Sequence, residues 1–164
     1  MSKFKIIYFL ILISFNFSLS QDKVPNIDLL DLNKNKVSSD EVLKEDKYYI
    51  LSFWATWCIP CINELDAISK NYSKWLNEGI EVLAISTDDY RTKKRVRPML
   101  KEKNWSFKFY LDENHFFKNA LDIDGIPHTV VTKGKKIIKS RTGYSDGEEL
   151  ELLKFIQDYK SKMF

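Results

Sequence analysis

The chain has 164 residues, of which 44% are hydrophobic, and this is enough for one domain with a sizeable core. Its 26 basic and 23 acidic residues leave a formal net charge of +3, and such a nearly balanced surface does not indicate a nucleic-acid partner. The sequence contains neither an internal repeat nor a low-complexity tract, which argues against repeat architectures and disordered tails.

The first twenty residues differ in kind from the rest of the chain. Two lysines precede an apolar run over residues 6–15, and a small-x-small pattern follows at residues 18–20. This is the layout of a secretory signal, and the run is shorter than the ~20 apolar residues that a membrane-spanning helix needs. We predict a signal peptide over residues 1–20, cleaved or kept as an N-terminal anchor, with a buried helix as the remaining alternative. The domain over residues 21–164 is then expected in the periplasm or another extracytoplasmic space.

The first elements of this domain are predicted to be short. Residues 26–39 alternate weakly around a polar centre and indicate a small hairpin. A short helix is expected over residues 38–44, with a serine or aspartate cap. Residues 47–55 are nearly all apolar, β-branched or aromatic, which is typical of a strand buried on both faces.

Residues 60–87 continue with a helix and a second buried strand. The apolar residues between 60 and 77 recur at helical spacing, and Gly79 closes this segment. Residues 80–87 predict another strand buried on both faces. A strand, a helix and a strand in this order predict a parallel βαβ unit.

The rest of the chain predicts a further helix–strand pair and then a closing hairpin and helix. The elements are expected in this order: a basic helix over 91–104, bent or restarted near Pro98, a strand over 106–111, a short helix over 114–121, two strands within 124–143 joined by a turn at Gly134, and a last helix over 146–162. The inner face of the last helix is assigned to Leu150, Leu153, Phe155, Ile156 and Tyr159. The predicted fold class is α/β, with a mixed central sheet and helices on both faces.

The only two cysteines, Cys58 and Cys61, lie where the predicted strand 47–55 gives way to the helix. Free backbone N–H groups and the helix dipole favour an anion at this place, so a thiolate is stabilised and the pKa of a thiol can fall. Cys61 lies one turn further along and can reach back to Cys58, and Pro60 in the first turn loses no hydrogen bond. The pair is therefore predicted to cycle between dithiol and disulfide.

Two other uses of the pair compete with redox chemistry. A tetrahedral metal site needs about four protein ligands, and His115 and His128 lack ligand spacing to the cysteines. A structural disulfide that closes so short a loop constrains little of the unfolded chain. We expect a redox pair, with no metal and no cofactor, although a thiolate metal chaperone stays open as an alternative function.

The segment Trp57-Cys58-Ile59-Pro60-Cys61, with Glu64 after it and Gly-Ile-Pro-His-Thr at 125–129, resembles the thioredoxin-like superfamily. The closest resemblance is to its exported TlpA/ResA-like branch, and it covers roughly residues 24–162. It implies a thioredoxin-like fold with an N-terminal hairpin and a central helix–strand insertion. It also implies a thiol–disulfide oxidoreductase that reduces protein disulfides, with cytochrome c maturation as one role and a membrane protein as an electron donor. We expect a monomer.

The resemblance also implies roles for individual residues. Cys58 is the attacking nucleophile and Cys61 resolves the mixed disulfide. Pro127 matches the family's cis-proline, which faces the cysteine pair, and an ordinary trans proline is the alternative. The residues expected to bind substrate are Trp57, Pro60, Ile126 and Pro127.

One position departs from the family pattern. Thioredoxins proper carry a buried aspartate in the strand before the motif, and here that position is Ser52. Glu64, three residues after Cys61, is the nearest substitute and is expected to accept the Cys61 proton. If it lies half-buried against the cysteines, its own pKa should be raised by desolvation. The alternative is an acid that only complements the helix dipole.

A thiol peroxidase is the other enzyme class that this fold supports. That chemistry needs a threonine or serine three residues before the reactive cysteine, and Ala55 occupies this position while Thr56 is one residue too close. The basic residues between 91 and 97 are interpreted as solvated surface or as a face that steers an acidic partner.

Overall fold

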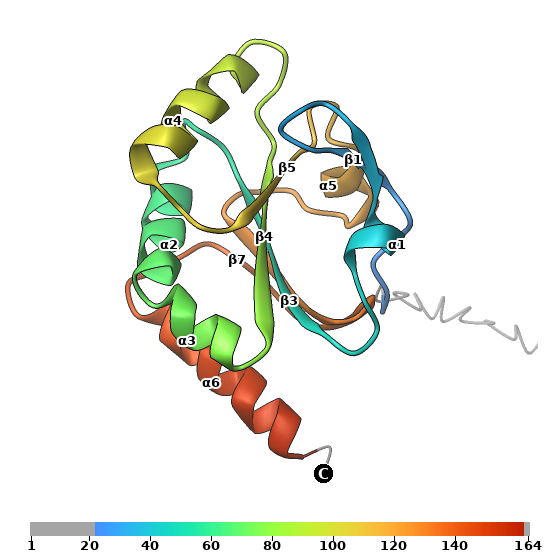
Figure 1. Ribbon diagram of the computed structural model, residues 1–164, viewed down its shortest axis with the longest axis vertical. Coiled ribbons are helices and arrows are strands. Elements are labelled where there is room, and N and C mark those ends of the chain that lie inside the picture. Colours follow the sequence, from blue (N-terminus) through green and yellow to red (C-terminus); the bar gives the residue numbers. More distant parts are fainter. Residues whose placement is uncertain (1–21, 163–164) are drawn as a thin grey trace, which may run out of the picture.

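The computed structural model describes residues 22–162, so the predicted signal peptide lies outside the described residues. These residues form one seven-stranded mixed sheet with helices on both faces, in the strand order β2-β1-β5-β4-β3-β6-β7 (Figure 1). The elements in chain order are β1 (Asp28–Leu30), β2 (Lys36–Ser38), α1 (Ser39–Val42), β3 (Tyr48–Trp54), α2 (Ile59–Lys70), α3 (Tyr72–Asn77), β4 (Ile80–Ser86), the 3₁₀ turn η1 (Lys93–Arg95), α4 (Val96–Lys103), β5 (Lys108–Leu111), α5 (Phe116–Ala120), β6 (His128–Lys133), β7 (Lys136–Thr142) and α6 (Glu148–Ser161). The predicted fold class and the thioredoxin-like architecture are confirmed.

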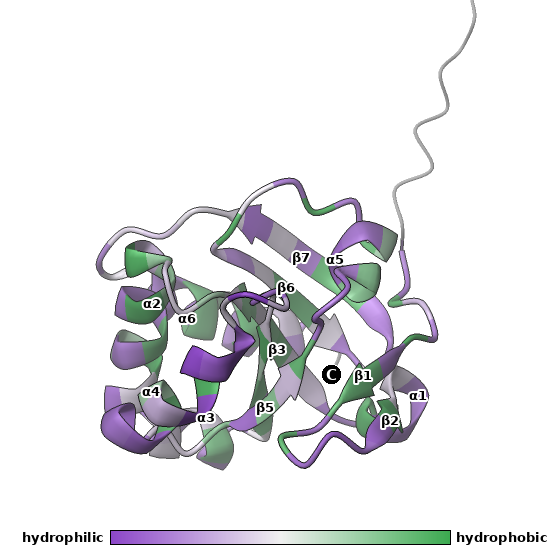
Figure 2. Ribbon diagram, turned by 90° about the horizontal axis from the view of Figure 1, so that it is seen from above, coloured by the Kyte–Doolittle hydropathy of each residue, from purple (hydrophilic) through white to green (hydrophobic). Residues whose placement is uncertain are grey.

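Strand β3 lies at the centre of the core because helices cover both of its faces. All seven of its residues are buried. Side chains alternate along a strand, and Ile50 and Trp54 pack into the cluster that includes residues of α2, α4 and α6. Leu51 and Phe53 pack into the second cluster, which includes Phe117 of α5. In Figure 2 the hydrophobic colour follows the strands at the centre of the sheet.

The predicted βαβ unit is present, and it fixes where the cysteines lie. β3 pairs in parallel with β4, and α2 makes the connection between them. The helix–strand insertion follows as α4 and β5, with β5 parallel to β4 and next to the N-terminal hairpin of β1 and β2. On the other side β6 is antiparallel to β3, and β7 closes the sheet. Within residues 22–162 no helix is both long enough and apolar enough to cross a membrane.

Two predicted helices break or restart at a different place from the one expected. The expected helix over 60–77 is two helices, α2 and α3, because Asn71 leaves the helical region with φ −119° and ψ 14°. The restart expected near Pro98 lies earlier, where η1 passes into α4 at Val96. Pro98 is then the third residue of α4, where a helix has no internal partner for the missing N–H.

The inner face of α6 was assigned wrongly at one position. Leu150 is 50% exposed, whereas Leu152, which the prediction left out, is 2% exposed and packs in the core. Successive helical residues are about 100° apart, so residues 150 and 152 cannot both face the sheet. Leu153, Phe155, Ile156 and Tyr159 do pack against the core, as predicted.

Candidate active site

The two cysteines lie where β3 ends and α2 begins, and they form a disulfide. The S–S distance is 1.97 Å and the Cα–Cα distance is 5.3 Å. Cys58 is the N-cap of α2, and its Sγ accepts a hydrogen bond from the backbone N–H of Cys61 at 3.3 Å. The predicted position at a helix N-terminus is confirmed, so a thiolate at Cys58 is stabilised by the N–H groups and the dipole of α2.

The residues around the disulfide are far more exposed than the disulfide itself. Trp57 is 57% exposed and Ile59 is 66% exposed, and Pro60 is also exposed. Cys58 keeps 5% of its surface accessible, whereas Cys61 is fully buried. Cys58 is therefore the more accessible of the two cysteines, and Trp57, Ile59 and Pro60 form the exposed surface next to it.

The loop before Cys58 is held by a buried carboxylate. Asp88, 1% exposed, accepts hydrogen bonds from the backbone N–H of Thr56 at 2.8 Å and from its hydroxyl at 2.6 Å. The hydroxyl of Ser86 donates to the same carboxylate at 2.9 Å. Asp88 thus fixes the loop that presents Cys58. The sequence-based prediction did not single out this residue, and the available signal was an acid directly after a buried strand.

Pro127 lies beside the end of β3 that leads to the cysteines. The bond between Ile126 and Pro127 is cis, as the resemblance implied. His128 pairs with Phe53 in the antiparallel ladder of β6 and β3, so Pro127 is carried to the level of Trp54. Ile126 packs against both hydrophobic clusters, and Pro127 is buried. Packing therefore holds these two residues in place next to the active-site loop.

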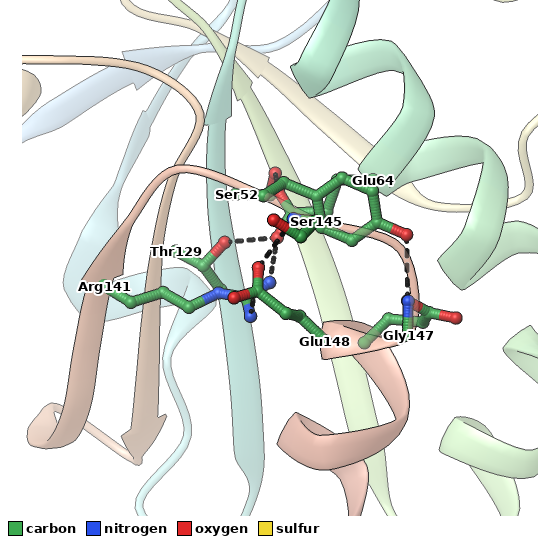
Figure 3. A network of polar contacts seen from close by, with 9 residues as sticks. Ser52, Glu64, Thr129, Arg141, Ser145, Gly147 and Glu148 are labelled. Atoms are coloured by element: carbon green, nitrogen blue, oxygen red, sulfur yellow. Dashed lines mark hydrogen bonds and ion pairs between the residues drawn. The ribbon is translucent and has the colours of Figure 1, made fainter.

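Glu64 points from α2 to a row of polar side chains on three adjacent strands. Ser52 of β3 is paired with Thr129 of β6, and Thr129 is paired with Arg141 of β7. The Glu64 carboxylate accepts hydrogen bonds from Thr129 Oγ1 at 2.7 Å, from an Arg141 guanidinium nitrogen at 2.9 Å and from Ser52 Oγ at 3.3 Å (Figure 3). Arg141 therefore completes an ion pair inside the protein.

The side chain of Glu64 is fully buried, which is deeper than the half-burial from which a raised pKa was expected. Burial raises the pKa of Glu64, while the hydrogen bonds from Thr129, Arg141 and Ser52 oppose that rise. A carboxyl group of raised pKa, one helical turn from Cys61, is suited to take a proton from a neighbouring thiol. The exchange rate of Glu64→Gln decides between this role and the alternative of an acid that only complements the helix dipole.

Arg141 is a second site residue, besides Asp88, that the sequence-based prediction missed. Its second terminal nitrogen lies 3.0 Å from the carboxylate of Glu148, which also accepts the backbone N–H of Ser145 at 2.8 Å (Figure 3). The guanidinium thus links the interior carboxylate of Glu64 to the start of α6. No local signal marks this arginine, because β7 carries basic residues at other, exposed positions.

The histidines have partners of their own. His128 contacts the hydroxyls of Thr142 and Ser140 at 2.7 and 2.8 Å, and His115 contacts the carbonyl of Thr87 at 2.8 Å. Within the described part of the chain no three His, Cys, Asp or Glu side chains gather as a metal site would require. The chemistry that the arrangement provides is thiol–disulfide exchange at Cys58.

Comparison with known proteins agrees with this chemistry. The model of the AhpC/TSA family matches residues 20–141. A thiol-disulfide oxidoreductase ResA of Bacillus cereus is 26% identical over 130 residues, which cover 79% of this chain and 73% of that protein. The ResA of Oceanobacillus iheyensis is 30% identical over 114 residues, but the match covers 68% of this chain and only 58% of that protein.

Solved structures share the whole fold. A thioredoxin-like protein from Porphyromonas gingivalis superposes with a TM-score of 0.72 at 33% identity, covering 82% of this chain and 90% of that chain. A putative thiol:disulfide interchange protein DsbE from Chlorobium tepidum has a TM-score of 0.73 at 20% identity, covering 84% and 94%, and shows the fold alone. Since the family match extends over most of the chain, the protein belongs to the AhpC/TSA family, and its thioredoxin-like fold with the paired Cys58 and Cys61 makes it a thiol–disulfide oxidoreductase.

Proposed function

We propose that the protein works outside the cytoplasm as a reductant of disulfides in other proteins, cytochrome c maturation being one such pathway. The signal-like layout of residues 1–20 supports export, and the similarity to proteins named ResA supports this class of reaction. The observation that carries the proposal is the unequal exposure of the two cysteine residues, 5% for Cys58 against 0% for Cys61.

The reaction begins with the dithiol form. The Cys58 thiolate attacks one sulfur of the partner's disulfide, the partner's S–S bond breaks, and the released thiolate takes a proton. Cys61 then gives its proton to the Glu64 carboxylate and attacks the Sγ of Cys58. The mixed disulfide breaks, the second partner thiolate leaves, and the Cys58–Cys61 disulfide remains. Two electrons have passed to the partner, and an external dithiol, for which we propose a membrane protein, restores the reduced form.

Each other site residue has a part in this sequence. Trp57 and Pro60 contact the partner at the exposed rim, while Ile126 and Pro127 form the wall against which its backbone lies. Glu64 is held by Arg141, Thr129 and Ser52 and receives the proton of the resolving thiol. We do not propose a peroxidase, because the Thr56 hydroxyl donates to Asp88 and Ala55 stands three residues before Cys58.

The reduction potential of the purified protein tests the direction of electron flow. We expect a value near that of thioredoxin, about −270 mV, rather than the value of about −120 mV typical of the strong oxidant DsbA. Catalysed reduction of a protein disulfide should accompany it. A potential near that of DsbA would make the protein an oxidant and overturn this part of the proposal.

Export is tested separately by intact-mass analysis of the protein from its native host. A cleaved signal predicts a chain that starts at Gln21, and an uncleaved anchor predicts the full chain in the membrane fraction. A full-length chain in the soluble cytoplasmic fraction would contradict both.

A further inference from the structure

A pocket of about 460 Å³ opens directly beside the residue that precedes the reactive cysteine. It is lined by Trp57, Thr87, Asp89, Arg91, Thr92 and His115. Trp54 is paired with Ser86 at the ends of β3 and β4, and the N–H of Thr87 donates to the carbonyl of Trp54 at 2.8 Å. The pocket and Cys58 therefore open at the same edge of the sheet.

The walls of this pocket combine an exposed indole with a positioned guanidinium. Arg91 donates through Nε to the Asp89 carboxylate at 3.1 Å, and a terminal nitrogen lies 3.1 Å from the same oxygen. The Arg91 side chain is nevertheless 72% exposed, and its guanidinium stacks 5.6 Å from the ring centre of Tyr90. Since a guanidinium has five N–H donors and Asp89 takes one edge of it, the other edge can bind a second carboxylate.

Along the chain, Arg91 and Thr92 of this pocket lead into a strongly basic stretch, which we call the basic segment: Arg91, Lys93, Lys94, Arg95 and Arg97. Lys93, Lys94 and Arg97 line a second pocket. Two acids form ion pairs with it, Asp89 with Arg91 and Glu113 with Lys93, and Asp31 attracts its far end electrostatically. Five positive charges against these three carboxylates leave the basic segment with an excess of positive charge. An excess of one sign beside a reactive group attracts partners of the opposite sign.

We propose that this pocket binds the stretch of a partner protein next to its reactive disulfide, and that the basic segment selects partners in which this stretch is acidic. The inference rests on the proposed function, because it names a preference among the disulfides that Cys58 attacks. The indole of Trp57 provides an apolar floor for the partner's chain, and Arg91 provides the charged contact. Asp89 does not reverse the preference, because its charge is matched by that of Arg91.

The test uses three synthetic peptides with the same disulfide, flanked by two glutamates, two glutamines or two lysines. For the reduced full-length protein we expect the acidic peptide to react faster than the glutamine peptide by about fivefold, the size of one exposed charged contact. The lysine peptide should react most slowly, and added salt should reduce the differences in rate among the three peptides. Equal rates for the acidic and glutamine peptides would overturn the inference.

Two charge-neutralising variants distinguish the effect of the pocket on the rates from the effect of the protein's net charge. Arg91→Gln should bring the ratio of acidic to glutamine rates close to one. Lys74→Gln makes the same change in net charge at an exposed position of α3, the helix that leads into the opposite end of β4, and should keep the ratio of the unchanged protein. If both variants lower the ratio equally, or Arg91→Gln leaves it intact, the pocket does not select charge.

A binding measurement keeps the inference testable even if exchange fails. Hydroxyethyl disulfide, which is neutral and small, reports whether the cysteine pair reacts at all, and failure with it would count against the proposed function alone. Serine versions of the peptides are then titrated into the oxidised protein while the Trp57 indole N–H resonance is followed, with Trp57→Phe to assign it. We expect the acidic peptide to bind about fivefold more tightly than the glutamine peptide. Equal affinities, or no shift of this resonance, would contradict the proposal that the pocket binds acidic stretches of a partner.

Discussion

Glu64 is placed by residues that are distant in sequence, and its surroundings explain how a chain with Ser52 can still supply an acid near the cysteines. Ser52 does not replace the missing strand carboxylate but donates a hydrogen bond to the one that α2 provides. Arg141 lowers the cost of burying that carboxylate by forming an ion pair at 2.9 Å. The carboxylate is therefore provided by Glu64 of α2, and Ser52, Thr129 and Arg141 of the strands hold it by hydrogen bonds.

The roles of the two cysteines can be separated by trapping. In Cys61→Ser the attack by Cys58 is retained but the mixed disulfide cannot be resolved, so the partner should stay covalently bound through Cys58. Cys58→Ser should trap almost none, because Cys61 is fully buried. Non-reducing electrophoresis followed by peptide mass mapping reads the result. A mixed disulfide found mainly on Cys61 would reverse the assignment.

Replacing Glu64 by glutamine keeps the shape of the side chain and removes its charge. A carboxylate near the cysteine pair repels the Cys58 thiolate and raises the pKa of Cys58. Removing this charge should lower that pKa, so we expect Cys58 alkylation to reach its midpoint at lower pH. Resolution loses its proton acceptor, so exchange near neutral pH should slow by about tenfold or more. Stopped-flow alkylation and disulfide-reduction rates measure the two effects.

Glu148→Gln is the matched control for this experiment. It makes the same chemical change on a carboxylate that contacts the same guanidinium, but Glu148 is 35% exposed and lies at the start of α6. We expect its alkylation curve and exchange rate to stay close to those of the unchanged protein. If Glu64→Gln also behaves in this way, Glu64 serves only to hold the fold.

At the scale of the elements, each helix is positioned by the apolar side chains that it places on the sheet. α6 packs on the same face as α2 through Leu152 and Ile156, and both are almost fully buried. Its first turn is also tied to the site, because Glu148 contacts Arg141. Packing and the polar network therefore fix the same end of α6.

A pair of leucines in α6 tests this orientation. Leu152→Ala removes a side chain that is 2% exposed and should lower the free energy of unfolding by about 2–5 kcal/mol. Leu150→Ala, at a position that is 50% exposed, should change it by less than about 0.5 kcal/mol. Urea unfolding gives both values. Equal losses would mean that α6 is rotated from the orientation described.

At the scale of the whole molecule, the network around Glu64 joins α2, β3, β6 and β7, so its protonation is coupled to global folding. Burial is the main cause of the raised pKa of Glu64, which means that the folded protein holds the proton more tightly than the unfolded chain. Ionisation then costs stability. Neutral Glu64 is compatible with its hydrogen bonds, since a protonated carboxyl still accepts.

The resulting pH dependence has a defined sign. Below the unfolded pKa of about 4.5 Glu64 is protonated in both states, and its favourable contribution is fully present. As the pH rises from there through the higher folded pKa, this contribution is lost. We expect the free energy of unfolding of the unchanged protein, minus that of Glu64→Gln, to fall with rising pH over this range and then to level. Urea unfolding across a pH series measures the difference, and a rise would contradict the burial argument.

Local sequence determined the order of the elements and the position of the cysteines. The apolar runs at 47–55 and 80–87 predicted β3 and β4, because strands covered on both faces have no polar alternation. The spacing of the two cysteines and Pro60 located the start of α2. These features depend on residues close together in the chain, and short-range patterns therefore suffice. The cis bond before Pro127 followed only from the resemblance to a known family.

Tertiary structure alone decided how the acid of the site is held and which helical faces are buried. The contact between Arg141 and Glu64 joins residues 77 positions apart, and it exists only because β7 is in register with β6 and β6 with β3. A one-residue slip in either pairing would turn Arg141 away from α2. Packing likewise decided which face of α6 is buried and where the helix predicted over 60–77 breaks, at Asn71. A helix with apolar residues on several sides has no single inner face until it packs on the sheet.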